Sequence, residues 1–163
     1  IALVSFGSGY YHLTPDNATL VWDRLPMTVA FMGLFVALLS EHMHESLGRF
    51  LLVPALAVGL ASVAWWRYAG DLRFYYWVQL APLLLIPVSL ALFPPRYTHR
   101  AYLLYGLAFY VLAKIAEIFD QELFALTSHS VSGHSVKHLL AACAPLFVYL
   151  MLWQRKPVAV QAG

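Results

Sequence analysis

Three histidines, one carboxylate and one hydroxyl are spaced so that they could build a metal-dependent site. His134 and His138 are four residues apart, as are Ser8 and His12, so each pair shares one face of a helix. Zinc binds imidazole nitrogens in tetrahedral geometry, and catalytic zinc sites use three protein ligands and one water. His12, His134 and His138 are therefore candidate zinc ligands. Asp23 and Ser8 are candidate catalytic residues, the first to accept a proton and the second to stabilise an oxyanion.

The elements that position these residues are predicted to be membrane-spanning helices. The 163-residue chain is 61% hydrophobic and 11% charged, with a mean hydropathy of +0.69, whereas soluble domains carry about a quarter charged residues. This composition excludes a disordered chain, a nucleic-acid-binding module and an ordinary soluble domain. The net charge of +2 indicates no anionic partner. The single cysteine, Cys143, excludes a disulfide framework and a cysteine-based metal site.

The stretches without charged residues predict an all-α, polytopic transmembrane helix bundle that forms a single domain over residues 1–163. The expected spans lie at about 25–41, 48–66, 74–93, 99–119 and 134–154, with residues 1–13 as part of a sixth. That first piece covers only about 20 Å of a hydrocarbon layer of about 30 Å, so it is either cut short or re-entrant. Because the chain begins with Ile1 inside an apolar run, we expect a fragment that lacks its N-terminus.

Loops between consecutive spans alternate between the two sides of the membrane, so the helix ends that carry the candidate residues meet on one side. His12, Asp23 and the 134–138 pair all lie at such ends. The opposite side carries slightly more basic residues, namely Arg49, Arg96, Arg100, Arg155 and Lys156. This distribution favours a cytoplasmic C-terminus.

Other interpretations of the polar residues compete with the metal site. Histidine pairs also ligate haem in membrane bundles, but haem ligands normally come from opposing helices. Lys114, Glu117 and Asp120 follow one another along the fifth span. We expect an ion pair between Lys114 and Glu117, with a substrate or proton path as the alternative.

Three further polar positions are expected to lie outside the site. Lys137 is predicted to reach the membrane interface rather than the substrate. The segment 41–45, with His42 and His44, is predicted to be a solvated loop, because residues two apart do not share a helix face. His129 is expected at the surface.

Segments 8–12, 23–27 and 133–138 together resemble the signature of the alkaline ceramidase family. The matching residues are Ser8, His12, Asp23, Leu25, Pro26, Met27, Gly133, His134 and His138. This family belongs to a superfamily of seven-helix membrane hydrolases that includes the progestin and adiponectin receptors. The resemblance implies a seven-helix fold, of which about six helices are present in this chain.

The resemblance further implies one zinc ion (Zn²⁺) held by His12, His134 and His138, with Asp23 and Ser8 beside the metal-bound water. The implied reaction is attack of that water on a ceramide-like lipid amide of the bilayer, which releases a fatty acid and an amine.

Two departures from the family pattern indicate a distant, bacterial branch and hence the inner membrane. Arg24 stands where the animal enzymes usually carry an acid, and their acidic N-terminal calcium site has no counterpart here. The alternative function is a receptor-like or scaffolding protein with a structural zinc site. Asp23 and Ser8 favour the enzyme, because a structural site needs no acid–base pair. The sequence predicts no oligomeric state.

Overall fold

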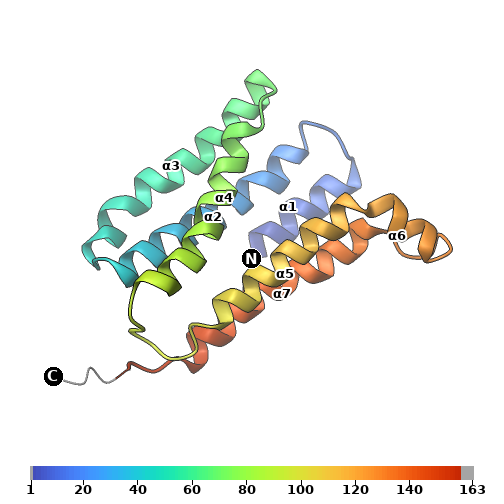
Figure 1. Ribbon diagram of the computed structural model, residues 1–163. Coiled ribbons are helices and arrows are strands. Elements are labelled where there is room, and N and C mark those ends of the chain that lie inside the picture. Colours follow the sequence, from blue (N-terminus) through green and yellow to red (C-terminus); the bar gives the residue numbers. More distant parts are fainter. Residues whose placement is uncertain (1, 159–163) are drawn as a thin grey trace. The chain divides into compact units, whose positions relative to one another are not determined.

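The computed structural model describes residues 2–158, which form seven α-helices and no β-strand. In chain order these are α1 (Ala2–Leu13), α2 (Leu20–His42), α3 (Ser46–Ala69), α4 (Arg73–Leu92), α5 (Tyr102–Ile118), α6 (Asp120–Leu126) and α7 (Gly133–Gln154) (Figure 1). The expected all-α class is confirmed. Ile1 of the expected first span and residues 159–163 of the expected domain lie outside the described residues.

Four helices, α2, α3, α4 and α7, are long and apolar enough to cross a membrane. Helices α5 and α6 meet this criterion only as a pair bent by 78°, which would be a fifth, broken span or a re-entrant loop. The helices begin and end within five residues of the predicted spans, and their crossing of a membrane stays a prediction. The bend and α6 were not predicted. At the bend, Phe119 leaves helical geometry with φ −94° and ψ 32°.

The chain divides into two compact units. The first, Ile1–Phe93, contains α1 to α4, and the second, Pro94–Gly163, contains α5 to α7. Ser8, His12 and Asp23 belong to the first unit, and His134 and His138 belong to the second. Whether these two units make up the single domain expected over residues 1–163 is not tested by this division, so the single domain stays a prediction.

In the first unit, α2 packs against α1, α3 and α4. Val63, Trp66 and Tyr75 form a buried cluster at the adjoining ends of α3 and α4. Gly59 permits close approach of α3 to α2, because a Cβ there would lie 3.1 Å from side-chain carbons of Met32 and Thr28. Small residues at such crossings are typical of helix packing in membranes.

The connections in the first unit are held by local hydrogen bonds. Before α2, Oδ1 of Asp16 accepts hydrogen bonds from the backbone N–H groups of Ala18 and Thr19, each at 2.7 Å. After α3, Gly70 adopts the left-handed conformation with φ 70° and donates its N–H to the carbonyl of Trp66 at 2.9 Å, a common helix C-cap. Asp71 then pairs with Arg73 at 2.7 Å at the start of α4.

In the second unit, α5 and α7 run side by side in opposite directions (Figure 1). The start of α5 meets the end of α7, because the Tyr102 hydroxyl donates a hydrogen bond to Oε1 of Gln154 at 3.2 Å. Midway, the rings of Phe109 and Phe147 stack with centroids 5.3 Å apart. Gly106 lies against the carbonyl of Ala144, where a Cβ would come within 3.1 Å of the oxygen.

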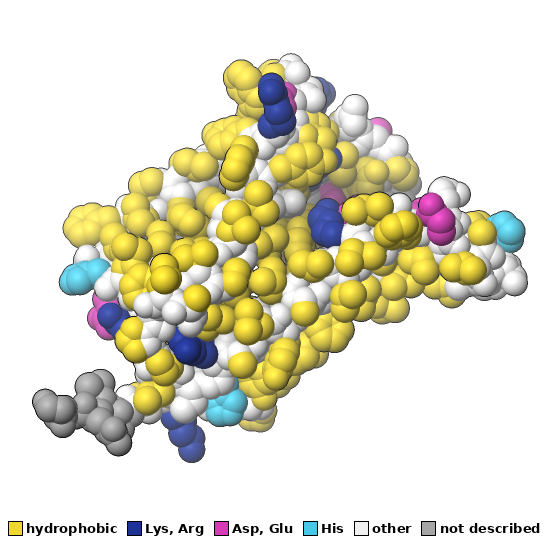
Figure 2. Space-filling model, in the orientation of Figure 1, with side chains coloured by type: hydrophobic (Ala, Val, Ile, Leu, Met, Phe, Trp, Pro, Cys, Tyr) yellow, Lys and Arg dark blue, Asp and Glu magenta, His cyan; other side chains and the backbone are white. Residues whose placement is uncertain are grey.

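Apolar side chains cover most of the face shown in Figure 2. In the second unit, α7 exposes apolar side chains near both of its ends, where Leu139 and Trp153 are 73% and 72% exposed. Such a surface is costly in water and suited to lipid. The chain therefore has the character of a multi-pass membrane protein.

Candidate metal centre

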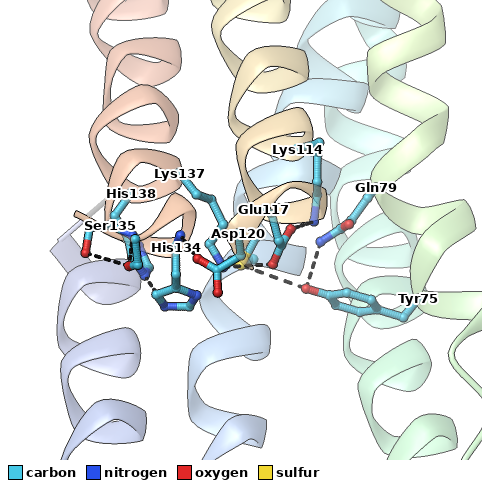
Figure 3. A network of polar contacts seen from close by, with 11 residues as sticks. Tyr75, Gln79, Lys114, Glu117, Asp120, His134, Ser135, Lys137 and His138 are labelled. Carbon is cyan, nitrogen blue, oxygen red and sulfur yellow. Dashed lines mark hydrogen bonds and ion pairs between the residues drawn. The ribbon is translucent and has the colours of Figure 1, made fainter. Parts of the chain in front are cut away.

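His134 and His138 lie together in the first turns of α7 (Figure 3). Their Nε2 atoms are 3.0 Å apart, and the two rings meet edge to face with centroids 4.7 Å apart. Two nitrogens bound to one tetrahedral zinc at about 2.0–2.1 Å would be about 3.3 Å apart. The donor set and spacing of this pair therefore fit two neighbouring positions around a single zinc ion.

The N-terminus of α7 is fixed by two hydrogen bonds to backbone N–H groups. The hydroxyl oxygen of Ser132, the N-cap, accepts from the N–H of Ser135 at 3.1 Å. Oδ1 of Asp120 accepts from the N–H of His134 at 2.7 Å. N-terminal N–H groups of a helix lack partners within the helix, so these oxygens satisfy groups that would otherwise be unpaired.

Gly133 brings this N-terminus against the end of α5. A Cβ on Gly133 would overlap the carbonyl oxygen of Ala116 and lie 2.7 Å from Cα of Asp120. Only glycine allows this approach, which places Asp120 beside the backbone of His134. In the sequence, Gly133 stood out only as part of a motif, and no role could be predicted for Asp120.

An ion-pair cluster lies beside the histidines and joins α5 to α7 (Figure 3). Glu117 accepts hydrogen bonds from Nζ of Lys114 and from Nζ of Lys137, each at 2.8 Å. The expected Lys114–Glu117 pair is confirmed. The expectation for Lys137 is wrong, because its side chain crosses to α5 and is only 21% exposed.

The remaining candidate residues lie in the first unit. Ser8 and His12 are one turn apart on α1, and Asp23 lies in the first turn of α2. Gly7 packs against the backbone of Trp22, since a Cβ there would overlap the Trp22 carbonyl. Ser8 directly follows Gly7 in α1, and Asp23 directly follows Trp22 in α2. The contact between the two helices therefore brings the backbone positions of Ser8 and Asp23 near each other.

His12 and Ser8 differ in burial. His12, at the C-terminal end of α1, is exposed, and its ring centroid lies 5.2 Å from that of Tyr11. Ser8 is half-buried, as is Asp23. His12, exposed at a helix end, can therefore be reached by a ligand while the helix backbone anchors it.

Arg24 follows Asp23 and belongs to the aromatic cluster of the first unit. Its guanidinium carbon lies 3.9 Å above the ring of Trp66 and 5.1 Å from the ring centroid of Tyr75. A cation over aromatic rings is stabilised by their quadrupoles. Where the family pattern has an acid, this chain therefore has a cation packed on aromatic rings.

Two carboxylates outside the helical spans have lowered pKa values. Hydrogen bonds from the Arg73 side chain lower the pKa of Asp71 to about 2, and the Arg73 backbone N–H adds to the effect. The backbone N–H of Thr19 lowers the pKa of Asp16. Both carboxylates are ionised near neutral pH and fix loops that lead into α2 and α4.

The other histidines lie apart from the candidate ligands along the chain. The prediction of a solvated loop is wrong for His42, which ends α2, is 8% exposed and contacts the carbonyl of Leu38 through Nδ1 at 3.0 Å. His44 is exposed and contacts the hydroxyl of Ser46 at 2.7 Å. His129 is exposed, as expected, with its ring against that of Phe124.

No protein family model matches this chain, and no curated protein and no solved structure matches it either. The resemblance to alkaline ceramidases therefore rests on the residues of segments 8–12, 23–27 and 133–138.

Proposed function

We propose that this protein is an integral-membrane, zinc-dependent hydrolase that cleaves a ceramide-like lipid amide. The observation that carries the proposal is the His134–His138 pair, whose facing Nε2 atoms are 3.0 Å apart at a hydrogen-bonded helix N-terminus. Such a pair supplies two preorganised ligands from one helix. The resemblance of the three segments to the ceramidase signature supports the same reaction class.

His12 is the third ligand in this proposal. We assign His12, His134 and His138 as the three protein ligands, each of which can offer one ring nitrogen. Three nitrogen ligands leave the fourth tetrahedral position for water, which is the ligand count of catalytic zinc sites. A zinc ion bound there would supply Lewis acidity, which polarises a carbonyl and makes water more acidic.

Asp23 and Ser8 have the proton-transfer and oxyanion roles. The carboxylate of Asp23 accepts a proton from the attacking water and returns it to the leaving nitrogen, so that an amine departs. The hydroxyl of Ser8 donates a hydrogen bond to the oxygen on which negative charge develops. Water adds to the carbonyl carbon, the C–N bond breaks, and the products are a fatty acid and an amine.

The lipid bilayer is both the surroundings and the source of substrate in this proposal. Four or five apolar helices would hold the chain in the membrane, with the site at a helix end where a lipid amide near the headgroup level can reach it. We place the protein in a bacterial inner membrane with the C-terminus in the cytoplasm, on the basis of the family departures and the basic residues.

The function is tested by fatty acid release from a labelled ceramide by the detergent-purified protein. Asp23→Asn is expected to lower turnover at least about 100-fold while zinc content stays unchanged, because a general acid–base group typically accelerates a reaction about 10²–10⁴-fold. His129→Ala is the matched control and is expected to retain activity. Zinc-loaded wild-type protein that releases no fatty acid from amide or ester lipids would refute the hydrolase and favour the structural-zinc alternative.

A further inference from the structure

The second unit contains a short clasp that joins the segment before α5 to the segment after α7. We define the clasp as residues 96–98 and 155–158. Tyr97 and Pro157 form an isolated antiparallel bridge. The N–H of Thr98 bonds the carbonyl of Lys156 at 2.9 Å, and the N–H of Val158 bonds the carbonyl of Arg96 at 2.9 Å. The Thr98 hydroxyl also accepts the N–H of Lys156 at 3.0 Å.

The clasp brings together basic residues from two distant parts of the sequence. Arg96 and Arg100 come from one segment, and Arg155 and Lys156 come from the other. The guanidinium of Arg155 lies 4.5 Å from the ring centroid of Tyr97, so this cation is held against the clasp. Arg96 and Lys156 are exposed.

No acidic residue lies in the chain segments that form the clasp. Residues 94–102 and 153–158 contain neither Asp nor Glu. The acids of the second unit are Glu117, Asp120 and Glu122, near the opposite end of α5. A helix of 17 residues is about 25 Å long, more than twice the Debye length at physiological salt. These three acids are therefore too far along α5 to neutralise Arg96 and Lys156.

The clasp adjoins the apolar end of a membrane-spanning helix. It follows directly after α7, whose last turn exposes Leu152 and Trp153 at 50% and 72%. A cationic surface next to exposed apolar side chains matches a ligand that has both a phosphate and acyl chains. Clusters of basic residues beside a transmembrane helix bind anionic lipids in this way.

We propose that the clasp is a binding site for the phosphate headgroup of an anionic phospholipid. Arg96 and Lys156 contact the phosphate, and the end of α7 contacts the acyl chains. The clasp hydrogen bonds hold the two basic segments together, so the site depends on the clasp as well as on its charge. This site is separate from the proposed zinc centre and does not depend on it.

The test measures lipid retained by the full chain, purified in zwitterionic detergent, after incubation with phosphatidylglycerol or phosphatidylcholine. The double variant Arg96→Gln/Lys156→Gln is expected to retain at least about tenfold less phosphatidylglycerol, since each basic residue near a membrane surface strengthens the binding of anionic lipid. Arg49→Gln/Arg67→Gln, which removes two exposed arginines of the first unit, is the matched control. An equal loss in both double variants would show a net-charge effect and overturn the site.

Two further experiments test whether lipid binding depends on the clasp hydrogen bonds and whether the site binds free phosphate instead. Thr98→Val keeps every charge but removes the acceptor of the Lys156 N–H, and it is expected to weaken retention of phosphatidylglycerol. Unchanged retention in this variant would contradict the role of the clasp. Excess inorganic phosphate is expected not to displace the lipid, and complete displacement would show a site for free phosphate instead.

Discussion

Oδ1 of Asp120, the first residue of α6, accepts a hydrogen bond from the backbone N–H of His134 in the first turn of α7 at 2.7 Å. This carboxylate serves the first helical turn that carries both His134 and His138. It satisfies an N–H group that has no partner within the helix, and its negative charge is favourable at a helix N-terminus. Asp120 therefore positions the histidine pair through the backbone.

Substitution of Asp120 tests this positioning. Asp120→Ala is expected to lower the free energy of unfolding by about 1–2 kcal/mol, as is typical for loss of a capping side chain. Asp120→Asn keeps an acceptor oxygen at the same place and is expected to lose less. Chemical denaturation in detergent micelles measures both, and wild-type stability in Asp120→Ala would contradict this role.

The Glu117–Lys137 ion pair is expected to contribute modestly to stability. Its two side chains are 37% and 21% exposed, so solvent screens the interaction and we expect a coupling energy of about 1 kcal/mol. A double-mutant cycle with Glu117→Gln and Lys137→Gln measures this value. The same cycle on Glu122 and Lys156 is the control and should give no coupling. A Glu117–Lys137 value near zero would mean that the pair does not tie α5 to α7.

Gly7 and Gly9 form a matched pair on α1. Gly7→Ala is expected to lower the free energy of unfolding by about 1–3 kcal/mol, because the new methyl group would overlap the Trp22 carbonyl. A Cβ on Gly9 meets nothing within 4 Å. Gly9→Ala is therefore expected to be neutral or stabilising, since alanine favours helix. Equal effects of the two substitutions would contradict the packing of α1 on α2.

We expect the stability of the loop between α3 and α4 to depend on pH through the ionisation of Asp71. Its pKa of about 2 lies below the value of about 3.9 for an unperturbed aspartate, so the ionised form stabilises the folded loop. That stabilisation is complete above about pH 4 and is lost as the pH falls towards 2. NMR titration of the Asp71 carboxyl carbon measures the midpoint. Arg73→Gln is expected to raise it towards 4, and an unchanged midpoint would exclude Arg73 as the cause.

Much of the helical architecture could be predicted, because the uncharged stretches that form helices and the residues that end them can be recognised from residue types alone. Pro94 and Pro95 follow the end of α4, and Gly70 follows the end of α3, as expected from their backbone restrictions. The Lys114–Glu117 pair was predictable because residues three apart share a helix face.

Contacts between elements could not be predicted in the same way. The side chain of Lys137 could point to lipid or to α5, and the choice depends on where Glu117 lies on a different helix. His42 was expected in solvent because α2 was expected to end at about residue 41, whereas α2 continues through it and its ring packs near Phe93. The bend after Ile118 could not be predicted, because no proline or glycine lies at that point of the sequence.

The proposed function requires that His12, His134 and His138 bind zinc, and this is measured by metal content. Elemental analysis of the detergent-purified protein should find about one zinc per chain in the wild type. The metal should be lost in His134→Ala and retained in His129→Ala, both checked for wild-type helicity by circular dichroism. Folded wild-type protein that binds no zinc, or a His134→Ala variant that retains a full zinc ion, would contradict zinc binding by these histidines.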